Sequence, residues 1–261
     1  MCRYEKVLGE VRKEINMYHT KHTTIEENID LRTTIIDFYL RYEKILLPLL
    51  IGLILSISFY YLDWHNELLW KSGVRFHVLK TGLDLSIPFV PGFAWIYILY
   101  YLFCFTPIFV IDTVATFRRI ALGYFLEGMI SFAIFVFYPT KMIRPEIAGS
   151  SISDKLLSII YHTDPGFNVF PSMHVANSLF VALIFYRYNK RLGLVFWAIA
   201  LLISVSIFFV KQHYLVDFIG GAIEAVGVYL IVFKGHVFVH KRLNSNPDMI
   251  HNEQGDGMKM A

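Results

Sequence analysis

The sequence predicts an all-α membrane protein, a bundle of six transmembrane helices with both termini in the cytoplasm. Of the 261 residues, 56% are hydrophobic and 17% are charged, which is too apolar for a water-soluble surface. Apolar runs recur along the chain, each near the length that crosses a hydrocarbon core of ~30 Å. Aromatic residues make up 16%, which suits helices whose ends lie among lipid headgroups.

Six segments of the chain are predicted to cross the membrane. Each is apolar over a length close to the ~20 residues that a transmembrane helix needs. Two of the six contain polar side chains, which are rare in such helices and indicate functional sites. The segments, with the two polar ones fourth and sixth, are 45–62, 94–111, 120–138, 169–186, 192–210 and 215–233.

The distribution of Lys and Arg predicts the orientation of these helices. Positive residues near membrane spans tend to stay on the cytoplasmic side. Seventeen of them fall in the termini and in the second and fourth connections, whereas seven fall in the other three connections. Both termini are therefore predicted to be cytoplasmic. Segments 63–93, 139–168 and 211–214 are predicted to face the periplasm, a lumen or the exterior.

Three parts are predicted along the chain. Residues 1–44 mix charged and apolar positions and are expected to form a cytoplasmic amphipathic arm. Residues 45–233 form the membrane domain, which holds the candidate catalytic residues described below, and residues 234–261 form a cytoplasmic tail. Within the first outer connection, residues 83–95 combine prolines with aromatic residues, which favours an ordered lip at the membrane surface.

Composition argues against several kinds of partner and cofactor. The net charge of +3 is small and dispersed, so no nucleic-acid partner is expected. The two cysteines are Cys2 and Cys104, and their positions predict neither a structural disulfide nor a zinc site. We therefore expect the bilayer as a partner and no nucleic acid, and the composition predicts no metal or other cofactor.

Polar residues gather at one membrane face of the predicted bundle. Three short stretches carry them, 141–145, 171–174 and 206–217. Because the chain crosses inward after His174 and returns outward before His213, the two histidines are expected at the same depth. Arg144 ends the preceding outward crossing and joins them there. These residues predict one water-accessible pocket.

Two histidines and a carboxylate in one pocket suit phosphoryl transfer through a phosphohistidine. A neutral imidazole is a competent nucleophile near pH 7, and a carboxylate on its other nitrogen fixes the tautomer. His213 and Asp217, four residues apart, fit these roles, although such a pair is equally a simple helix-end contact. His174, on a neighbouring helix, is placed to protonate the leaving alkoxide.

Phosphoryl oxygens also need fixed cations and N–H donors. Arg144 is the best candidate, because its planar fork matches two phosphate oxygens. Ser172 and the free amides at the start of the fourth span add donors. Glu224 lies seven residues after Asp217 on the same helical face, so it either lines the pocket floor or pairs with a basic neighbour or a water.

In these motifs the chain resembles the type 2 phosphatidic acid phosphatase superfamily of membrane lipid phosphatases and phosphotransferases. The family signatures are Lys-x6-Arg-Pro, Pro-Ser-Gly-His and Ser-Arg-x5-His-x3-Asp. Arg144-Pro145 ends the first, Pro171-Ser172-Met173-His174 matches the second except for Met, and Ser206, His213 and Asp217 match the third.

The resemblance implies a six-helix fold that acts without a metal ion. It also implies a role for each matched residue. His213 is the implied nucleophile, Asp217 its orienting partner and His174 the general acid, with Arg144, Ser172 and Ser206 around the phosphate.

Two cations of the family signatures are missing from this chain. Phe137 stands at the Lys position of the first signature, and Ile207 stands at the Arg position of the third. Lys141 and Lys211 are candidate replacements, because one lies in the same loop as the first signature and the other lies beside the nucleophile. The forms of the second and third signatures look more like the branch that contains inositol phosphorylceramide synthase-like proteins.

The predicted function is that of a metal-independent membrane lipid phosphatase. It would hydrolyse a lipid phosphate monoester or pyrophosphate at the non-cytoplasmic face through a phosphohistidine. Two alternatives stay open. A lipid phosphotransferase of the inositol phosphorylceramide synthase type would pass a phosphoryl head group to a lipid alcohol. A non-catalytic lipid-binding or transport protein would explain the missing cations.

Overall fold

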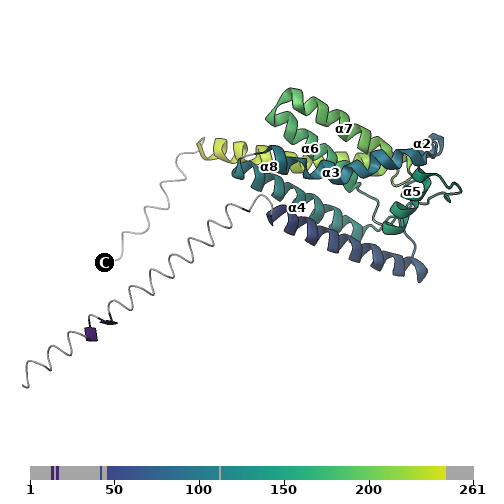
Figure 1. Ribbon diagram of the computed structural model, residues 1–261, viewed down its shortest axis with the longest axis horizontal. Helices are drawn as coiled ribbons and strands as arrows, with labels where there is room; N and C mark the ends of the chain where they lie inside the picture. The colour runs from purple at the N-terminus through teal and green to yellow at the C-terminus, as the bar shows by residue number, and fades with distance from the viewer. Residues whose placement is uncertain (1–12, 15, 18–41, 43–45, 112, 245–261) are drawn as a thin grey trace, which may run out of the picture. The chain divides into compact units, whose positions relative to one another are not determined.

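The computed structural model describes residues 13, 14, 16, 17, 42, 46–111 and 113–244, with side chains through residue 234 (Figure 1). The chain divides into two units, 1–47 and 48–261, and the second holds the candidate site. Almost all of the predicted arm, 1–44, lies outside the described residues, as does the predicted tail beyond residue 244.

The described part of the chain is helical, which confirms the predicted all-α class. Its two β-bridges are isolated, and no strand forms within the described residues. Five helices there are long and apolar enough to cross a membrane, so the protein is an integral membrane protein. They are Leu46–Lys71, η1 (Pro91–Phe93) continuing into α3 (Ala94–Val110), α4 (Val114–Phe137), α7 (Lys190–Phe209) and α8 (Leu215–Asn244).

The fourth predicted span corresponds to α6 (Met173–Tyr188), which has 16 residues and is shorter than these five helices. At 1.5 Å per residue it is about 24 Å long. Ten of its residues are buried, and it packs against α3, α4, α7 and α8 (Figure 1). Because protein surrounds α6, its polar side chains meet other helices instead of lipid.

The helix Leu46–Lys71 packs beside α4. Leu55 lies against Gly128, and the rings of Phe59 and Phe135 are 6.4 Å apart. The end predicted at residue 62 was wrong, because the helix continues for nine residues into the expected outer connection. An ion pair of 2.6 Å between Glu67 and Lys71, four residues apart, supports this extra length.

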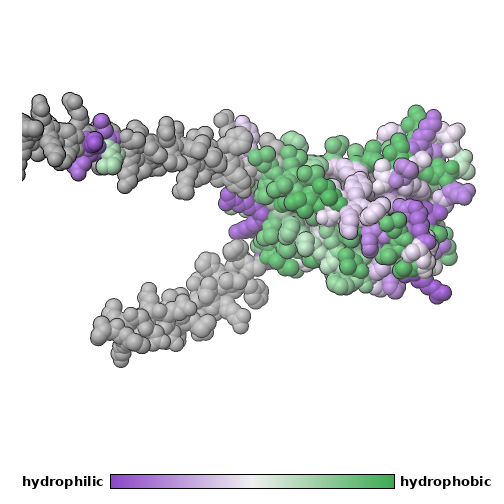
Figure 2. All heavy atoms as spheres, turned by 90° about the horizontal axis from the view of Figure 1, so that it is seen from below, coloured by the Kyte–Doolittle hydropathy of each residue, from purple (hydrophilic) through white to green (hydrophobic). Residues whose placement is uncertain are grey.

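Two short helices lie outside the long ones, α2 (Gly82–Ser86) and α5 (Ile152–Thr163). Each begins with a capping box, Thr81 with Asp84 and Ser151 with Asp154. α5 lies in a segment predicted to be a connection between spans, although its Ser-x-x-Asp start is a recognisable helix signal. Figure 2 shows that hydrophilic side chains gather at the end of the bundle that carries α2 and α5.

The lip expected at 83–95 is ordered and attached to the end of α7. The backbone N–H of Val90 donates to the carbonyl of Phe209 at 3.0 Å. The rings of Phe93 and Phe209 stack with centroids 4.2 Å apart. This attachment holds α2 next to the turn between α7 and α8, which carries His213.

Candidate active site

The structure brings the two predicted histidines into contact. His174 lies in the first turn of α6, which Ser172 caps, and His213 lies in the turn between α7 and α8. The Nε2 atom of His213 is 3.3 Å from Nδ1 of His174. Although 39 positions separate them, the hairpin of α6 and α7 returns the chain to the same depth, as the sequence predicts.

The surroundings of His213 determine which ring nitrogen carries its proton. Nδ1 is 2.8 Å from the carbonyl oxygen of Val169 and 3.5 Å from Oδ2 of Asp217. Both neighbours are acceptors, so Nδ1 is the protonated nitrogen and donates to the Val169 carbonyl. The lone pair therefore lies on Nε2, the atom that faces His174. This is the tautomer that a nucleophilic Nε2 requires.

Asp217 lies close to the imidazole, and a backbone carbonyl lies closer to it. Oδ2 of Asp217 accepts the backbone N–H of Tyr214 at 2.8 Å, and Oδ1 is buried without a hydrogen-bond partner. The Val169 carbonyl is the nearer acceptor for Nδ1 of His213. Sequence patterns did not reveal this carbonyl, because any residue type supplies one.

The start of α8 is fixed by the lip. Oδ1 of Asp84, on α2, accepts the backbone N–H of Leu215 at 2.9 Å. A carboxylate at this position gives a partner to a backbone N–H that the helix itself leaves free. The positive end of the helix dipole also stabilises its negative charge. Asp84 therefore connects the lip to the His213 turn. This role of Asp84 was not predictable from the sequence, because its partner lies 131 positions away.

Arg144 is held by partners on two sides. Its guanidinium donates to the backbone carbonyl of Asp164 and to Oε1 of Gln212, and it is 3.2 Å from Oδ1 of Asp164. It also stacks over the ring of Tyr161 at 4.5 Å. Gly166 has φ +82°, and a Cβ there would lie 2.9 Å from Cζ of Arg144. A glycine is thus required beside the guanidinium.

Three nitrogen atoms in this part of the molecule are buried without a hydrogen-bond partner. They are Nε of Arg144, Nε2 of Gln212 and Nε2 of His174. Gln212 bonds Arg144 and immediately precedes His213, which contacts His174, so the three belong to one connected group. Buried donors normally have partners. A phosphoryl group has acceptor oxygens for the N–H groups of Arg144 and Gln212, and for Nε2 of His174 when that imidazole is protonated.

Ser172 and Ser206 are both fully buried. The hydroxyl oxygen of Ser172 accepts the backbone N–H of Val175 at 3.4 Å, and its own backbone N–H donates to the carbonyl of Asp217 at 3.1 Å. Gly221 permits this contact between α6 and α8, because a Cβ there would collide with the carbonyl of Ser172. Ser206 donates to the carbonyl of Ile203 at 2.7 Å, within its own helix.

The two candidate replacement lysines are engaged elsewhere. Nζ of Lys141 lies 3.6 Å from the ring centre of Phe167 and 4.7 Å from that of Trp70. Burial and the positive charge of Arg144 lower the pKa of Lys141. Nζ of Lys211 donates to the carbonyl of Ile87 at 2.6 Å, and burial lowers the pKa of Lys211.

Lys211→Met is expected to reduce stability more than catalysis. The substitution removes the bond to the Ile87 carbonyl, which attaches α2 to the end of α7. We expect the free energy of unfolding to fall by about 1–2 kcal/mol, with kcat changed less than tenfold. Thermal denaturation in detergent and a turnover assay measure the two effects. Lys155→Met, on exposed α5 surface, is the control. A large loss of kcat at unchanged stability would place Lys211 at the phosphate instead.

Glu224 lies against α4. Both of its carboxylate oxygens are 3.0 Å from the hydroxyl of Ser131, which donates to them. The side chain is 8% exposed. The structure thus gives Glu224 a hydroxyl partner on a neighbouring helix, which neither reading of the sequence named. The basic residues Arg144 and His213 form their hydrogen bonds with groups other than Glu224.

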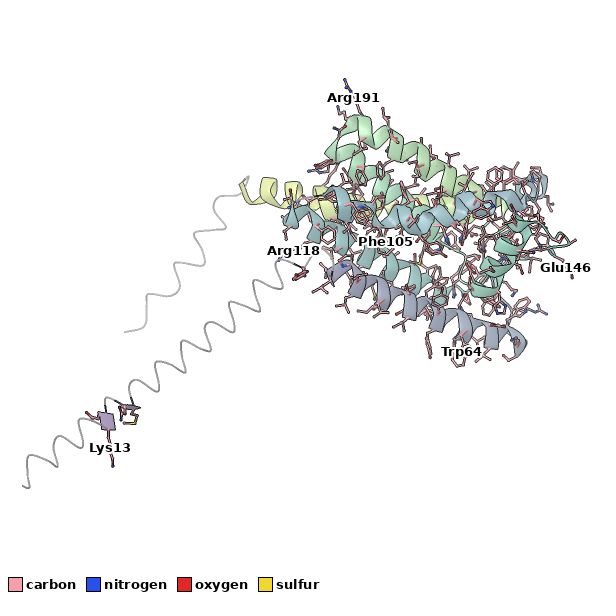
Figure 3. The ribbon with its side chains drawn as sticks, in the orientation of Figure 1. Lys13, Trp64, Phe105, Arg118, Glu146 and Arg191 are labelled. Carbon is pink, nitrogen blue, oxygen red and sulfur yellow. The ribbon has the colours of Figure 1, made fainter. Side chains whose placement is uncertain are left out.

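An apolar cavity of about 260 Å³ opens beside His174. Helix Leu46–Lys71, α3 and α4 supply most of its lining, and α6 and Asp164 close its outer end. Phe105, labelled on α3 in Figure 3, is one of the lining residues. The lining reaches from His174 and Asp164 to Pro48, Pro107 and Phe117. This cavity was not predictable from the sequence, because its walls come from five separate helices.

The described residues contain no group of three or more His, Cys, Asp or Glu side chains with the arrangement of a metal site. The titratable groups near His213 are paired with backbone groups and with one another.

Burial raises the pKa of Tyr161 to about 12, although the charge of Arg144 opposes the rise. Its hydroxyl therefore stays protonated and donates to the carbonyl of Val210 at 2.7 Å.

Comparisons with known proteins give one family. An uncharacterized protein of Methanocaldococcus jannaschii is 27% identical over 128 residues, or 48% of this chain. The match spans 49% of that relative, so this chain covers about half of its length. No solved structure matches the chain. The family model of the PAP2 superfamily matches residues 76–231, more than half of the chain and all three motif stretches, and the chain therefore belongs to the PAP2 superfamily.

Proposed function

We propose that this protein is a lipid phosphatase that forms a phosphohistidine on Nε2 of His213. The observation that carries the proposal is the pairing of this unprotonated nitrogen with His174 at 3.3 Å, beside an apolar cavity in the membrane. Family membership supports phosphatase or phosphotransferase chemistry in general. The hydrolytic reaction, the lipid substrate and the residue roles are the proposed part.

In the first step, Nε2 of His213 attacks phosphorus, a P–N bond forms and the ester P–O bond breaks. The leaving alkoxide takes a proton from His174, which enters this step protonated and whose Nδ1 is 3.3 Å from Nε2 of His213. The positive imidazole that results is stabilised by the Val169 carbonyl and by Asp217. The guanidinium of Arg144 and the amide of Gln212 stabilise the phosphoryl oxygens.

In the second step, a water molecule attacks the phosphohistidine. His174, now neutral, takes a proton from that water, and the P–N bond breaks to give inorganic phosphate. The histidine pair thus returns to its starting protonation state. As in the family that the sequence resembles, we propose that no metal ion takes part.

We propose that the cavity holds a hydrocarbon chain of the substrate. Its lining on the first long helix runs from Pro48 to Tyr60, which is ~18 Å at 1.5 Å per residue. A chain lying there would leave its headgroup beside His174 and Asp164. Apolar walls with a few polar groups at one end are typical of sites for amphiphilic ligands.

Gly52→Phe is expected to discriminate long-chain from soluble substrates. Gly52 lines the cavity, and no atom lies within 4 Å of a Cβ built there, so a phenyl ring has room to enter. We expect kcat/KM to fall roughly tenfold or more for a long-chain lipid phosphate. For p-nitrophenyl phosphate it should stay unchanged. Gly227→Phe, on α8 and equally uncrowded, is the matched control. Equal losses on both substrates would argue against a chain in this cavity.

We propose that the site faces the non-cytoplasmic side of the membrane. The count of Lys and Arg, 17 against seven, supports this orientation. Arg118 and Arg191 lie at one end of the bundle, opposite Glu146 (Figure 3). In sealed vesicles of known orientation, a membrane-impermeant substrate added outside should be hydrolysed only when the α5 end faces outward.

Transfer to a lipid alcohol is a second candidate, and the apolar cavity beside His174 favours it. A site that limits water lets an alcohol compete for the phosphohistidine. In that case the protein belongs to the branch with inositol phosphorylceramide synthase-like proteins, and a head group travels with the phosphoryl group. The reaction would conserve the phosphodiester and release no inorganic phosphate.

The third candidate is a lipid-binding or transport protein without catalysis. The side chain at the first missing cation, Phe137, is 87% exposed, and the side chain at the second, Ile207, is fully buried. Both side chains are apolar, so neither supplies a charge to a phosphate group. Vanadate mimics pentacoordinate phosphorus, so it should stabilise a catalytic pocket against heat and leave a scaffold unaffected.

One assay separates the three candidates. Purified protein in mixed micelles with EDTA is given a panel of lipid phosphates and a lipid alcohol, and both free phosphate and new phospholipid are followed. Phosphate release supports the phosphatase, and new phospholipid supports the transferase. No turnover on any substrate, together with no response to vanadate, would remove both enzymatic candidates.

A further inference from the structure

The nucleophile is tied to a helix that lies outside the family match. Residues 76–231 match the family, whereas helix Leu46–Lys71 precedes them. Near its outer end this helix carries Asp63 and Asn66, which are 2% and 4% exposed. Both contact Asn168, which immediately precedes Val169, the residue whose carbonyl accepts the proton of His213.

Asn168 has a backbone conformation that needs support. Its φ is +55°, in the left-handed region that few residues other than glycine adopt, and asparagine is among those that tolerate it. Its side-chain amide is held at both ends. Oδ1 accepts Nδ2 of Asn66 at 2.5 Å, and Nδ2 donates to Oδ1 of Asp63 at 3.1 Å.

The peptide group that joins Val169 to Phe170 is held by a hydrogen bond on each side. Its N–H, from Phe170, donates to Oγ1 of Thr140 at 3.0 Å, and its carbonyl, from Val169, accepts Nδ1 of His213 at 2.8 Å. The N–H of Val169 donates to the same hydroxyl, and the N–H of Asn168 donates to the carbonyl of Thr140. The direction of the Val169 carbonyl therefore depends on the conformation of Asn168 and on Thr140.

We propose that Asp63 and Asn66 are positioning residues for His213, acting through Asn168 and the Val169 carbonyl. Together they hold the acceptor that keeps the proton on Nδ1 and the lone pair on Nε2. Without this support, Asn168 relaxes and the carbonyl turns away, so the imidazole loses its nearer acceptor. The inference rests on the proposed function, since it concerns the nucleophile of that reaction.

Three substitutions test the proposal. Asp63→Ala removes the acceptor for the Asn168 amide, whereas Asp63→Asn keeps an oxygen that accepts it. Asn168→Ala removes the amide and disfavours positive φ. We expect Asp63→Ala and Asn168→Ala to lower kcat about tenfold or more with KM unchanged, because the nucleophile is misoriented while the substrate still binds. Asp63→Asn should restore kcat to within about twofold to threefold of the wild type.

A spectroscopic readout separates positioning from simple loss of stability. In ¹⁵N-histidine-labelled protein in nanodiscs, the tautomer of His213 is measured directly and assigned by comparison with His213→Ala. We expect the Nδ1–H form in the wild type and in Asp63→Asn, and a mixture with the Nε2–H form in Asp63→Ala. Ser131→Ala, which also removes a buried hydrogen bond, should lower thermal stability without changing the tautomer.

The outcomes distinguish this proposal from the proposed function. An Asp63→Ala protein with the wild-type tautomer and wild-type kcat, whatever its stability, would overturn the positioning role. A wild-type protein that forms no phosphohistidine would remove the proposed function. The tautomer measurement would still decide whether Asp63 controls His213, because it needs no turnover.

Discussion

His213→Ala is expected to abolish the phosphoenzyme and to reduce turnover of a lipid phosphate by roughly 10⁴-fold or more. The substitution removes Nε2, the nitrogen with the free lone pair, so no other group in the pocket forms the covalent intermediate. His174 is not expected to take over, because the proposed reaction uses it to transfer protons, and its ring is held against Tyr97 and Tyr100, at 4.7 and 4.4 Å between centroids. Acid-labile, base-stable phosphate incorporation and steady-state turnover are the measurements.

His162→Ala is the matched control for this change. His162 lies in the last turn of α5 and its side chain is exposed. It should keep wild-type turnover and the phosphoenzyme. A His213→Ala protein that still incorporated phosphate would show that another residue is the nucleophile. Retained vanadate binding with lost turnover would show that the pocket is folded and that only the chemistry is missing.

Arg144→Ala is expected to lower kcat roughly 10²–10³-fold, because the guanidinium stabilises charge that develops on the phosphoryl oxygens. Arg144→Lys should rescue little of this loss. The planar guanidinium of Arg144 bonds Asp164 and Gln212 at the same time, and a lysine ammonium cannot reproduce that geometry. Single-turnover kinetics with a lipid phosphate, which isolate phosphoenzyme formation, are the appropriate measurement.

The control for Arg144 is Arg191→Ala, at the end of the bundle opposite Glu146 (Figure 3). It should leave the single-turnover rate unchanged. Gln212→Leu should cost less than Arg144→Ala, and the double variant should be no worse than Arg144→Ala alone, because the two side chains act as a unit. Strictly additive losses would contradict the shared role inferred from their hydrogen bond.

Several features of the protein follow from local sequence. Hydrophobic runs identify membrane helices by length and composition alone, so the all-α class and the long helices were predictable. The alternation of crossings placed His174 and His213 at one depth without any knowledge of packing. The outward extension of the first long helix and the presence of α5 were not predicted. Both lie in polar segments, in which hydropathy does not indicate a helix.

In the candidate site, too, the residue types were predictable from the sequence and their partners were not. The residue types of Arg144, His174, His213 and Asp217 carried their signal in the sequence, because ionisable side chains that gather at one face of a membrane bundle indicate a functional site. The lysines near the site carried the same signal, yet the ammonium of Lys211 bonds a carbonyl of the lip and that of Lys141 lies over aromatic rings. Charge predicts a need for a partner without saying which partner is nearest.

The sequence by itself determined the class of the protein, the depth of its two histidines and the side chains available for phosphoryl transfer. Only the tertiary structure decided how those side chains are held. The acceptor for His213 is a backbone carbonyl, and Asn168 before it bonds Asp63 across 105 positions. Hydrophobic length is a local property, whereas the direction of a hydrogen bond depends on where distant segments meet. That dependence is the physical reason why the pocket, and the cavity beside it, appeared only in the folded chain.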